Sequence, residues 1–165
     1  QPGNRMKIYL KTVHNAYIYL ILYDSQKELF LLFPNTEKGF FYDYQIGKEY
    51  LIPEKKIWFY LKNGSGMEIF HLIVSRTRCK NLEEVMNEYL SLMEKQRVPE
   101  ATLNNAKQAV LEEIRVLKKR NSIFQGLNEK PLSIAGDYRG DKQIHQYIFM
   151  IEVENFYAKT FRVEH

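Results

Sequence analysis

The segment from Ala16 to Tyr23 restricts the fold more than any other part of the sequence. Side chains along an extended strand point alternately to opposite faces. That alternation places three tyrosines and an isoleucine on one face of this segment, and an isoleucine and two leucines on the other. Because both faces are apolar or amphipathic, the sequence predicts a central strand with further structure packed on its tyrosine face.

Other short runs of aromatic, leucine and β-branched residues predict further strands. Met6 to Val13 and Leu29 to Phe33 flank the central segment, and the polar breaks between them are short enough for antiparallel connections. Lys56 to Leu61 and Met67 to Ser75 are separated by Asn63-Gly64-Ser65-Gly66, which favours a tight turn. The sequence therefore predicts that these last two runs pair as a hairpin.

The apolar period becomes helical after Ser75. Asn81 is a good N-cap with Glu84 three residues later, which predicts a helix running to about Gln96. Pro99 suits the first turn of a second helix, which runs to about Arg120. We expect the pair to form a helical hairpin laid against the sheet. The apolar stripes are Leu82, Val85, Met86, Tyr89, Leu92 and Met93 on the first helix and Leu103, Ala106, Val110, Ile114 and Leu117 on the second.

The last third of the chain predicts a loop followed by two strands. Asn121 to Gln143 contains glycines, a proline and charged residues, which is typical of a long loop. His145 to Glu152 and Phe156 to Val163 alternate, and we expect both to return to the sheet. The predicted fold is mainly β within the α+β class: an immunoglobulin-like antiparallel β-sandwich, one domain over 1–165, with a two-helix insertion at 81–120.

Length, charge, cysteine content and apolar runs limit the class of protein. The 165 residues suit one domain, and a net charge of +4 is too small to imply a nucleic-acid partner. Basic clusters at Arg76 to Lys80 and Arg115 to Arg120 are interpreted as solvated helix ends. The single cysteine, Cys79, forms no internal disulfide, and no apolar run reaches the length of about 18 residues that crosses a bilayer. The opening Gln1 and the lack of an apolar signal core at this end favour either a trimmed chain or a processed product.

The sequence shows no pattern of residues that predicts catalysis, a metal or a cofactor. Cys79 and His71 are interpreted as a loop residue and a sheet residue. The four histidines lack metal-ligand spacing. Asp137 and Asp141 are interpreted as a solvated turn rather than a calcium loop. We therefore expect a protein that is not an enzyme.

The aromatic stretch Phe40 to Tyr44 and the loop around Tyr138 are the candidate partner-binding surfaces. Aromatic rings on loops supply contact area, although the same rings also serve as packing anchors. Arg139 begins Arg-Gly-Asp, a tripeptide of adhesive proteins. The candidate partner-binding residues are Phe40, Phe41, Tyr42, Tyr44, Tyr138 and Arg139.

Motifs in the first half resemble a bacterial family, domain of unknown function 4384. They are Tyr-Ile-Tyr-Leu at Tyr17, Leu-Leu-Phe-Pro-Asn at Leu31, and Ile-Gly-Lys at Ile46 leading to Ile-Pro at Ile52. The likeness ends near Ser75. It implies an accessory module, often envelope-associated, without assigned catalytic residues.

These observations together predict a non-enzymatic binding or accessory module that acts on an unknown protein partner. The expected location is the periplasm or the cell surface, with the cytoplasm as the alternative. Two other functions stay open: a hydrolytic or metal-dependent enzyme with dispersed site residues, and a glycan-binding module on an aromatic platform. The oligomeric state does not follow from the sequence.

Overall fold

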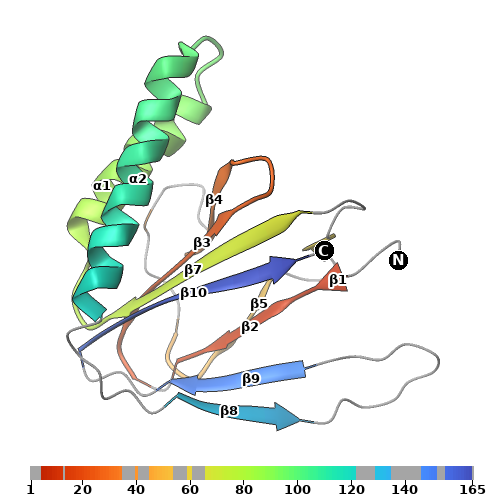
Figure 1. Ribbon diagram of the computed structural model, residues 1–165. Helices are drawn as coiled ribbons and strands as arrows, with labels where there is room; N and C mark the ends of the chain where they lie inside the picture. Colours follow the sequence, from red (N-terminus) through yellow and green to blue (C-terminus); the bar gives the residue numbers. More distant parts are fainter. Residues whose placement is uncertain are drawn as a thin grey trace.

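A four-stranded antiparallel sheet forms the centre of the protein (Figure 1). The computed structural model describes residues 5–12, 14–34, 40, 45–53, 59–60, 66–121, 129–134, 146–151 and 155–164. Within these residues the sheet has the order β10-β7-β3-β4. Its strands are β3 (Tyr17–Tyr23), β4 (Leu29–Phe33), β7 (Met67–Ser75) and β10 (Phe156–Glu164).

The central strand β3 is buried on both faces, as the sequence predicts. Tyr19 and Ile21 lie in one apolar cluster together with residues of the two helices. Leu20 and Leu22 lie in a second cluster on the opposite face of the sheet. The alternation in this segment therefore gives the correct face for each side chain, and the tyrosine face is the one that the helices cover.

Strand β7 is also central, which makes the predicted hairpin wrong. Its partner on one side is β3, with Ile21 opposite His71. On the other side β10 pairs along the whole strand, with Thr160 opposite His71. The run before it forms β6 (Phe59–Tyr60), which pairs with β1 (Arg5–Met6) instead. A turn sequence does not require its two flanks to pair, and here both edges of β7 are paired with the long strands β3 and β10.

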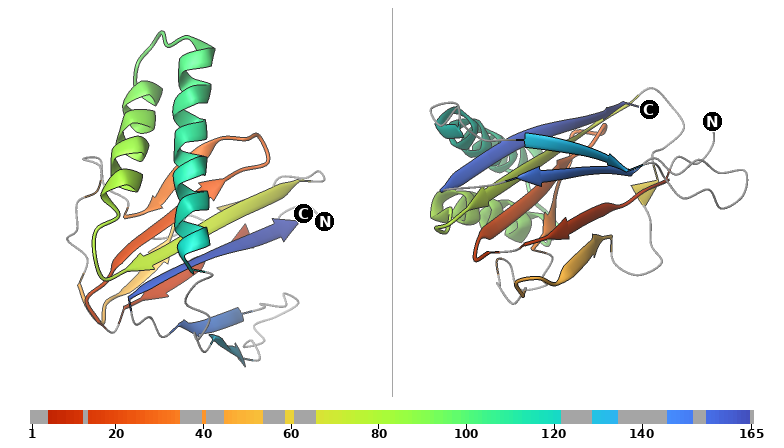
Figure 2. Two further views of the ribbon diagram at one scale, coloured as in Figure 1. Left: turned by 60° about the vertical axis from the view of Figure 1, so that its left-hand side comes forward. Right: turned by 90° about the horizontal axis from the view of Figure 1, so that it is seen from below.

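The two helices form a hairpin that packs on one face of the sheet (Figures 1 and 2). They are α1 (Lys80–Met93) and α2 (Glu100–Asn121), so the predicted bounds are close. The predicted stripe of α2 is confirmed, since Val110, Ile114 and Leu117 belong to the helix-side cluster. Figure 1 and the left view of Figure 2 show the far end of the hairpin extending beyond the sheet.

The start of α1 differs from the prediction. The N-cap is Cys79, which makes no side-chain cap hydrogen bond, and not Asn81. The Cys79 carbonyl accepts from the Glu83 N–H at 3.0 Å, while the Cys79 N–H donates to the hydroxyl of Tyr19 at 2.9 Å. A contact with the sheet thus fixes the beginning of this helix, which a local capping pattern does not reveal.

Short two-stranded ribbons lie beside the main sheet. Strands β2 (Ile8–Lys11) and β5 (Glu49–Ile52) pair with each other. Their inward side chains, among them Ile8 and Ile52, complete the apolar cluster on the face of the sheet that the helices leave open. The main sheet is therefore covered on both faces.

The predicted long loop contains a strand. Glu129–Ile134 forms β8, which pairs with β9 (Gln146–Ile151) in a separate ribbon. Pro131 lacks an amide donor and suits only an edge strand, and a two-stranded ribbon consists of edges. Of the two final strands, β10 joins the main sheet as predicted, whereas β9 pairs with β8. The mainly-β, α+β class is confirmed, while the immunoglobulin-like arrangement stays a prediction.

Candidate functional site

A buried polar network joins the base of α1 to the sheet. The Tyr19 hydroxyl donates to the Glu83 carboxylate at 2.7 Å, and both side chains are buried. Arg78 forms an ion pair with the same carboxylate, with its Nε 3.1 Å from one Glu83 oxygen. Burial raises the pKa of the neighbouring Cys79 thiol, and the charge of Glu83 adds to the rise. This environment keeps Cys79 protonated near neutral pH, which is the unreactive form.

A second network joins both helices to the β3–β4 turn. The Lys107 ammonium of α2 donates to the Glu28 carboxylate at 2.9 Å and to the Lys27 carbonyl at 2.8 Å. The Tyr89 hydroxyl of α1 donates to the other Glu28 oxygen at 3.1 Å. Burial raises the pKa of Tyr89 to about 12, and the charge of Glu28 contributes. The turn itself is fixed by the Asp24 carboxylate, which accepts the Glu28 N–H at 2.8 Å.

His71 lies in the sheet beneath α2, as the sequence predicts. Its Nδ1 is 3.2 Å from the Thr160 hydroxyl on the neighbouring strand. Burial lowers the pKa of His71 to about 4, with the charges of Lys118 and Arg162 acting in the same direction. The imidazole is therefore neutral at physiological pH.

The outer face of the β2–β5 ribbon exposes an apolar pair. Tyr9 and Leu51 are directly opposite each other in the register and are 46% and 45% exposed. Ile46 lies in the turn before β5 and is 53% exposed. That turn is held to the end of β2, because the Gly47 N–H donates to the Thr12 carbonyl at 2.7 Å. We call Tyr9 and Leu51 the ribbon patch.

Charged groups border the ribbon patch. Lys11 and Glu49 form an exposed ion pair at 3.5 Å on the same ribbon. A hydrogen bond from Tyr9 lowers the pKa of the Glu49 carboxyl, and Lys11 lowers it further. An apolar centre with a polar rim is the usual composition of a protein–protein contact.

Of the predicted partner-binding residues, only Phe40 lies within the described part of the chain. It is half-buried and packs on the helix-side cluster, with its ring centroid 5.6 Å from that of Tyr19. This contact gives Phe40 a packing role. Phe41, Tyr42, Tyr44, Tyr138 and Arg139 lie outside the described residues.

The sequence did not identify the ribbon patch. Its residues come from two runs about forty positions apart, and only their register across the ribbon brings Tyr9 opposite Leu51. The alternation of Ile8 to Lys11 does indicate part of the ribbon patch. If Leu10 points inward, Tyr9 lies on the opposite, outer face of the strand.

Two kinds of site are not found among the residues that the structure describes. Among the described residues, no group of three or more histidine, cysteine, aspartate or glutamate side chains is placed to hold a metal ion. Within the same residues, no helix is long and apolar enough to cross a membrane.

Comparison with known proteins gives one match. Residues 1–78 match the family model described as Domain of unknown function (DUF4384), which confirms the resemblance in the first half of the chain. The matched region contains the ribbon patch and ends within the connection between β7 and α1. No curated protein and no solved structure matches the chain.

Proposed function

We propose that this chain is a non-enzymatic accessory module of a bacterial, envelope-associated protein, and that it binds another protein through the ribbon patch. The observation that carries the proposal is the direct opposition of Tyr9 and Leu51 on the exposed face of β2–β5. Exposed apolar side chains held together on a rigid element favour contact with a partner.

The geometry of the patch supports a preformed contact surface. Strand pairing fixes Tyr9 and Leu51, and the bond from the Gly47 N–H to the Thr12 carbonyl holds the end of the ribbon together. Tyrosine contributes a large contact area with few rotatable bonds, so its ordering on binding costs little entropy.

The state of the reactive side chains supports a role without catalysis. His71 is neutral and bonded to Thr160, so it lacks the poised pKa of a general base. The Cys79 thiol is held in its protonated form. Lys107 is buried against Glu28. Each of these groups has a structural partner that accounts for its position.

The envelope location rests on what the resemblance to this family implies, and the family model itself covers residues 1–78. The proposed compartment is the periplasm or the cell surface. Fractionation of the native organism, followed by detection of the protein with an antibody, tests this part separately. Recovery in the cytoplasmic fraction alone would contradict it.

Site-specific photo-crosslinking tests the binding surface. A benzoylphenylalanine residue replaces Leu51 in the full chain, which is expressed in the native organism. We expect a discrete crosslinked protein that disappears when Tyr9→Ser is added. The matched position is Gln108, an exposed residue of α2, and the matched second substitution is Val116→Ser, which removes a similarly exposed apolar side chain. The same adduct from position 108, or no adduct from position 51, would refute the proposal.

A further inference from the structure

Basic residues from two distant segments meet at one end of the helical hairpin. Two lie in the connection from β7 to α1, one is the first residue of α1, and three lie in the last turn of α2. We call this set the basic end. All its side chains are exposed, and the only carboxylates in residues 76–84 and 118–120 are Glu83 and Glu84. The members are Arg76, Arg78, Lys80, Lys118, Lys119 and Arg120.

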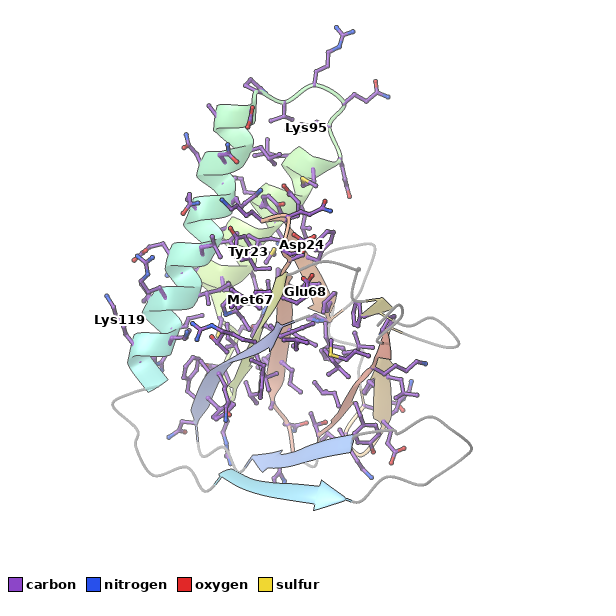
Figure 3. The ribbon with its side chains drawn as sticks, turned by 45° about the vertical axis from the view of Figure 1, so that its right-hand side comes forward. Tyr23, Asp24, Met67, Glu68, Lys95 and Lys119 are labelled. Atoms are coloured by element: carbon purple, nitrogen blue, oxygen red, sulfur yellow. The ribbon has the colours of Figure 1, made fainter. Side chains whose placement is uncertain are left out.

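Several contacts show that the two segments are close together. Arg120, at the end of α2, acts electrostatically on Cys79, the N-cap of α1. Its guanidinium lies 5.2 Å from the centre of the Phe156 ring at the start of β10. The Arg76 N–H donates to the Asn155 carbonyl at 3.0 Å. Figure 3 shows Lys119 at the opposite end of the hairpin from Lys95.

The positive surface continues along β10. The charges of Lys118 and Arg162 both lower the pKa of His71, so Arg162 of β10 adds a positive charge to the side of the sheet on which α2 ends. Phe156 and Arg162 are six residues apart on one strand, which spans roughly 20 Å. The surface is therefore a stripe rather than a point.

Interaction with the helix dipole explains the cations at the end of α2 but not those at the start of α1. Cations in the last turn of α2 favour its macrodipole. The opposite holds at α1, because Arg76, Arg78 and Lys80 lie at or before its first turn, where the helix dipole is positive. Arg78 is matched by Glu83. Within the described residues, neither Arg76 nor Lys80 has a carboxylate partner, so their position is locally unfavourable.

The composition of the stripe favours carboxylates on a protein segment over nucleic acid. Arginine pairs with carboxylates through two parallel hydrogen bonds and is enriched at protein interfaces. Binding of single-stranded nucleic acid relies on exposed aromatic rings that stack with bases. Among the described residues near this end, the rings of Phe156 and Tyr157 are 3% and 1% exposed, and that of Tyr17 is half-buried against the helix-side cluster.

We infer that the basic end, with Arg162, binds an extended acidic segment of a partner protein. This surface is separate from the ribbon patch, so the inference does not depend on the proposed function. It gives the module a second contact that is driven by charge, with a strength that falls as salt rises.

Fluorescence anisotropy with a defined probe tests the inference. The probe is a fluorescein-labelled peptide of alternating glutamate and serine, and its control peptide has glutamine in place of glutamate. The full chain is compared with Lys80→Glu/Lys118→Glu, which alters one cation from each helix. The matched variant is Lys95→Glu/Arg97→Glu in the exposed connection between the helices, which makes the same change in net charge.

We expect the glutamate peptide to bind, the glutamine peptide not to bind, and the first double variant to weaken binding by about tenfold or more. The variant at positions 95 and 97 should change affinity by less than about twofold. Equal loss from both variants would reduce the effect to net charge and overturn the inference. Tighter binding of phosphatidylglycerol vesicles or oligothymidine, lost in the same variant, would also overturn it. Retained crosslinking at position 51 keeps the proposed function standing in either case.

Discussion

The Tyr19 hydroxyl lies 2.7 Å from the Glu83 carboxylate in the interior of the protein and joins the central strand to the first turn of α1. The same hydroxyl accepts the Cys79 N–H at 2.9 Å. One side chain therefore serves both a backbone donor at the helix start and a buried charge. This contact explains why α1 begins where it does without a side-chain cap.

Tyr19→Phe should lower the free energy of unfolding by about 1 to 3 kcal/mol, because it leaves the Cys79 N–H and the Glu83 carboxylate each with one partner fewer. Urea denaturation followed by circular dichroism measures the change. Tyr9→Phe is the matched control, since Tyr9 is exposed, and should shift stability by less than about 0.5 kcal/mol. Equal effects would show that the buried hydroxyl contributes nothing specific.

Lys107 and Glu28 should be energetically coupled. Lys107→Met removes a buried cation that Glu28 contacts at 2.9 Å, and Glu28→Gln removes its charge partner. A double-mutant cycle should give a coupling free energy between about 0.5 and 3 kcal/mol, read from urea denaturation. The pair Lys95→Met and Glu28→Gln shares no contact and should be additive. Additivity of the Lys107 pair as well would contradict the role of this bond.

Stability should fall in acid because of His71. Its pKa is about 4 when folded, below the value of 6.5 for a free imidazole, so folding favours the neutral form. The contribution of neutral His71 to the free energy of unfolding is complete above pH 6.5 and is lost as pH falls towards 4. Its total is roughly 3 kcal/mol. His71→Gln should flatten this part of the profile, as measured by denaturation across that range. His14→Gln, at an exposed position, should leave the profile unchanged.

A fragment of residues 1–78 should not fold alone. It lacks α1, α2 and β10, so it exposes the apolar helix-side face of β3 and the edge of β7 that β10 covers over nine residue pairs. We expect poor amide dispersion in its nuclear magnetic resonance spectrum and no cooperative unfolding. A cooperative transition resembling that of the full chain would show that the family-matched region is an independent folding unit.

The sequence predicted the elements that have a strong period. The two-sided burial of Tyr17 to Tyr23 followed from alternation, and the buried stripe of α2 followed from helical spacing. The partners of each strand did not follow, because β7 pairs with strands far away in the sequence rather than with its neighbour. The Asn81 cap failed for a related reason: a tertiary bond from Cys79 to Tyr19 sets the helix start.

The candidate sites depended on juxtapositions that a single pattern does not contain. Tyr9 and Leu51 meet only through the register of β2 and β5. The two basic clusters are visible in the sequence, but each cluster by itself is typical of a solvated helix end. An antiparallel helical pair brings the start of α1 and the end of α2 together. The predicted helical hairpin therefore implies that the two basic clusters lie close to each other.

The two polar networks attach the helical hairpin to the sheet at two separate points, in addition to the apolar packing of both helices. The network at Glu83 joins the base of the hairpin to the central strand. The network from Lys107 and Tyr89 to Glu28 lies further along both helices and joins them to the β3–β4 turn. Both helices are therefore coupled to the sheet at the turn as well as at the base of the hairpin.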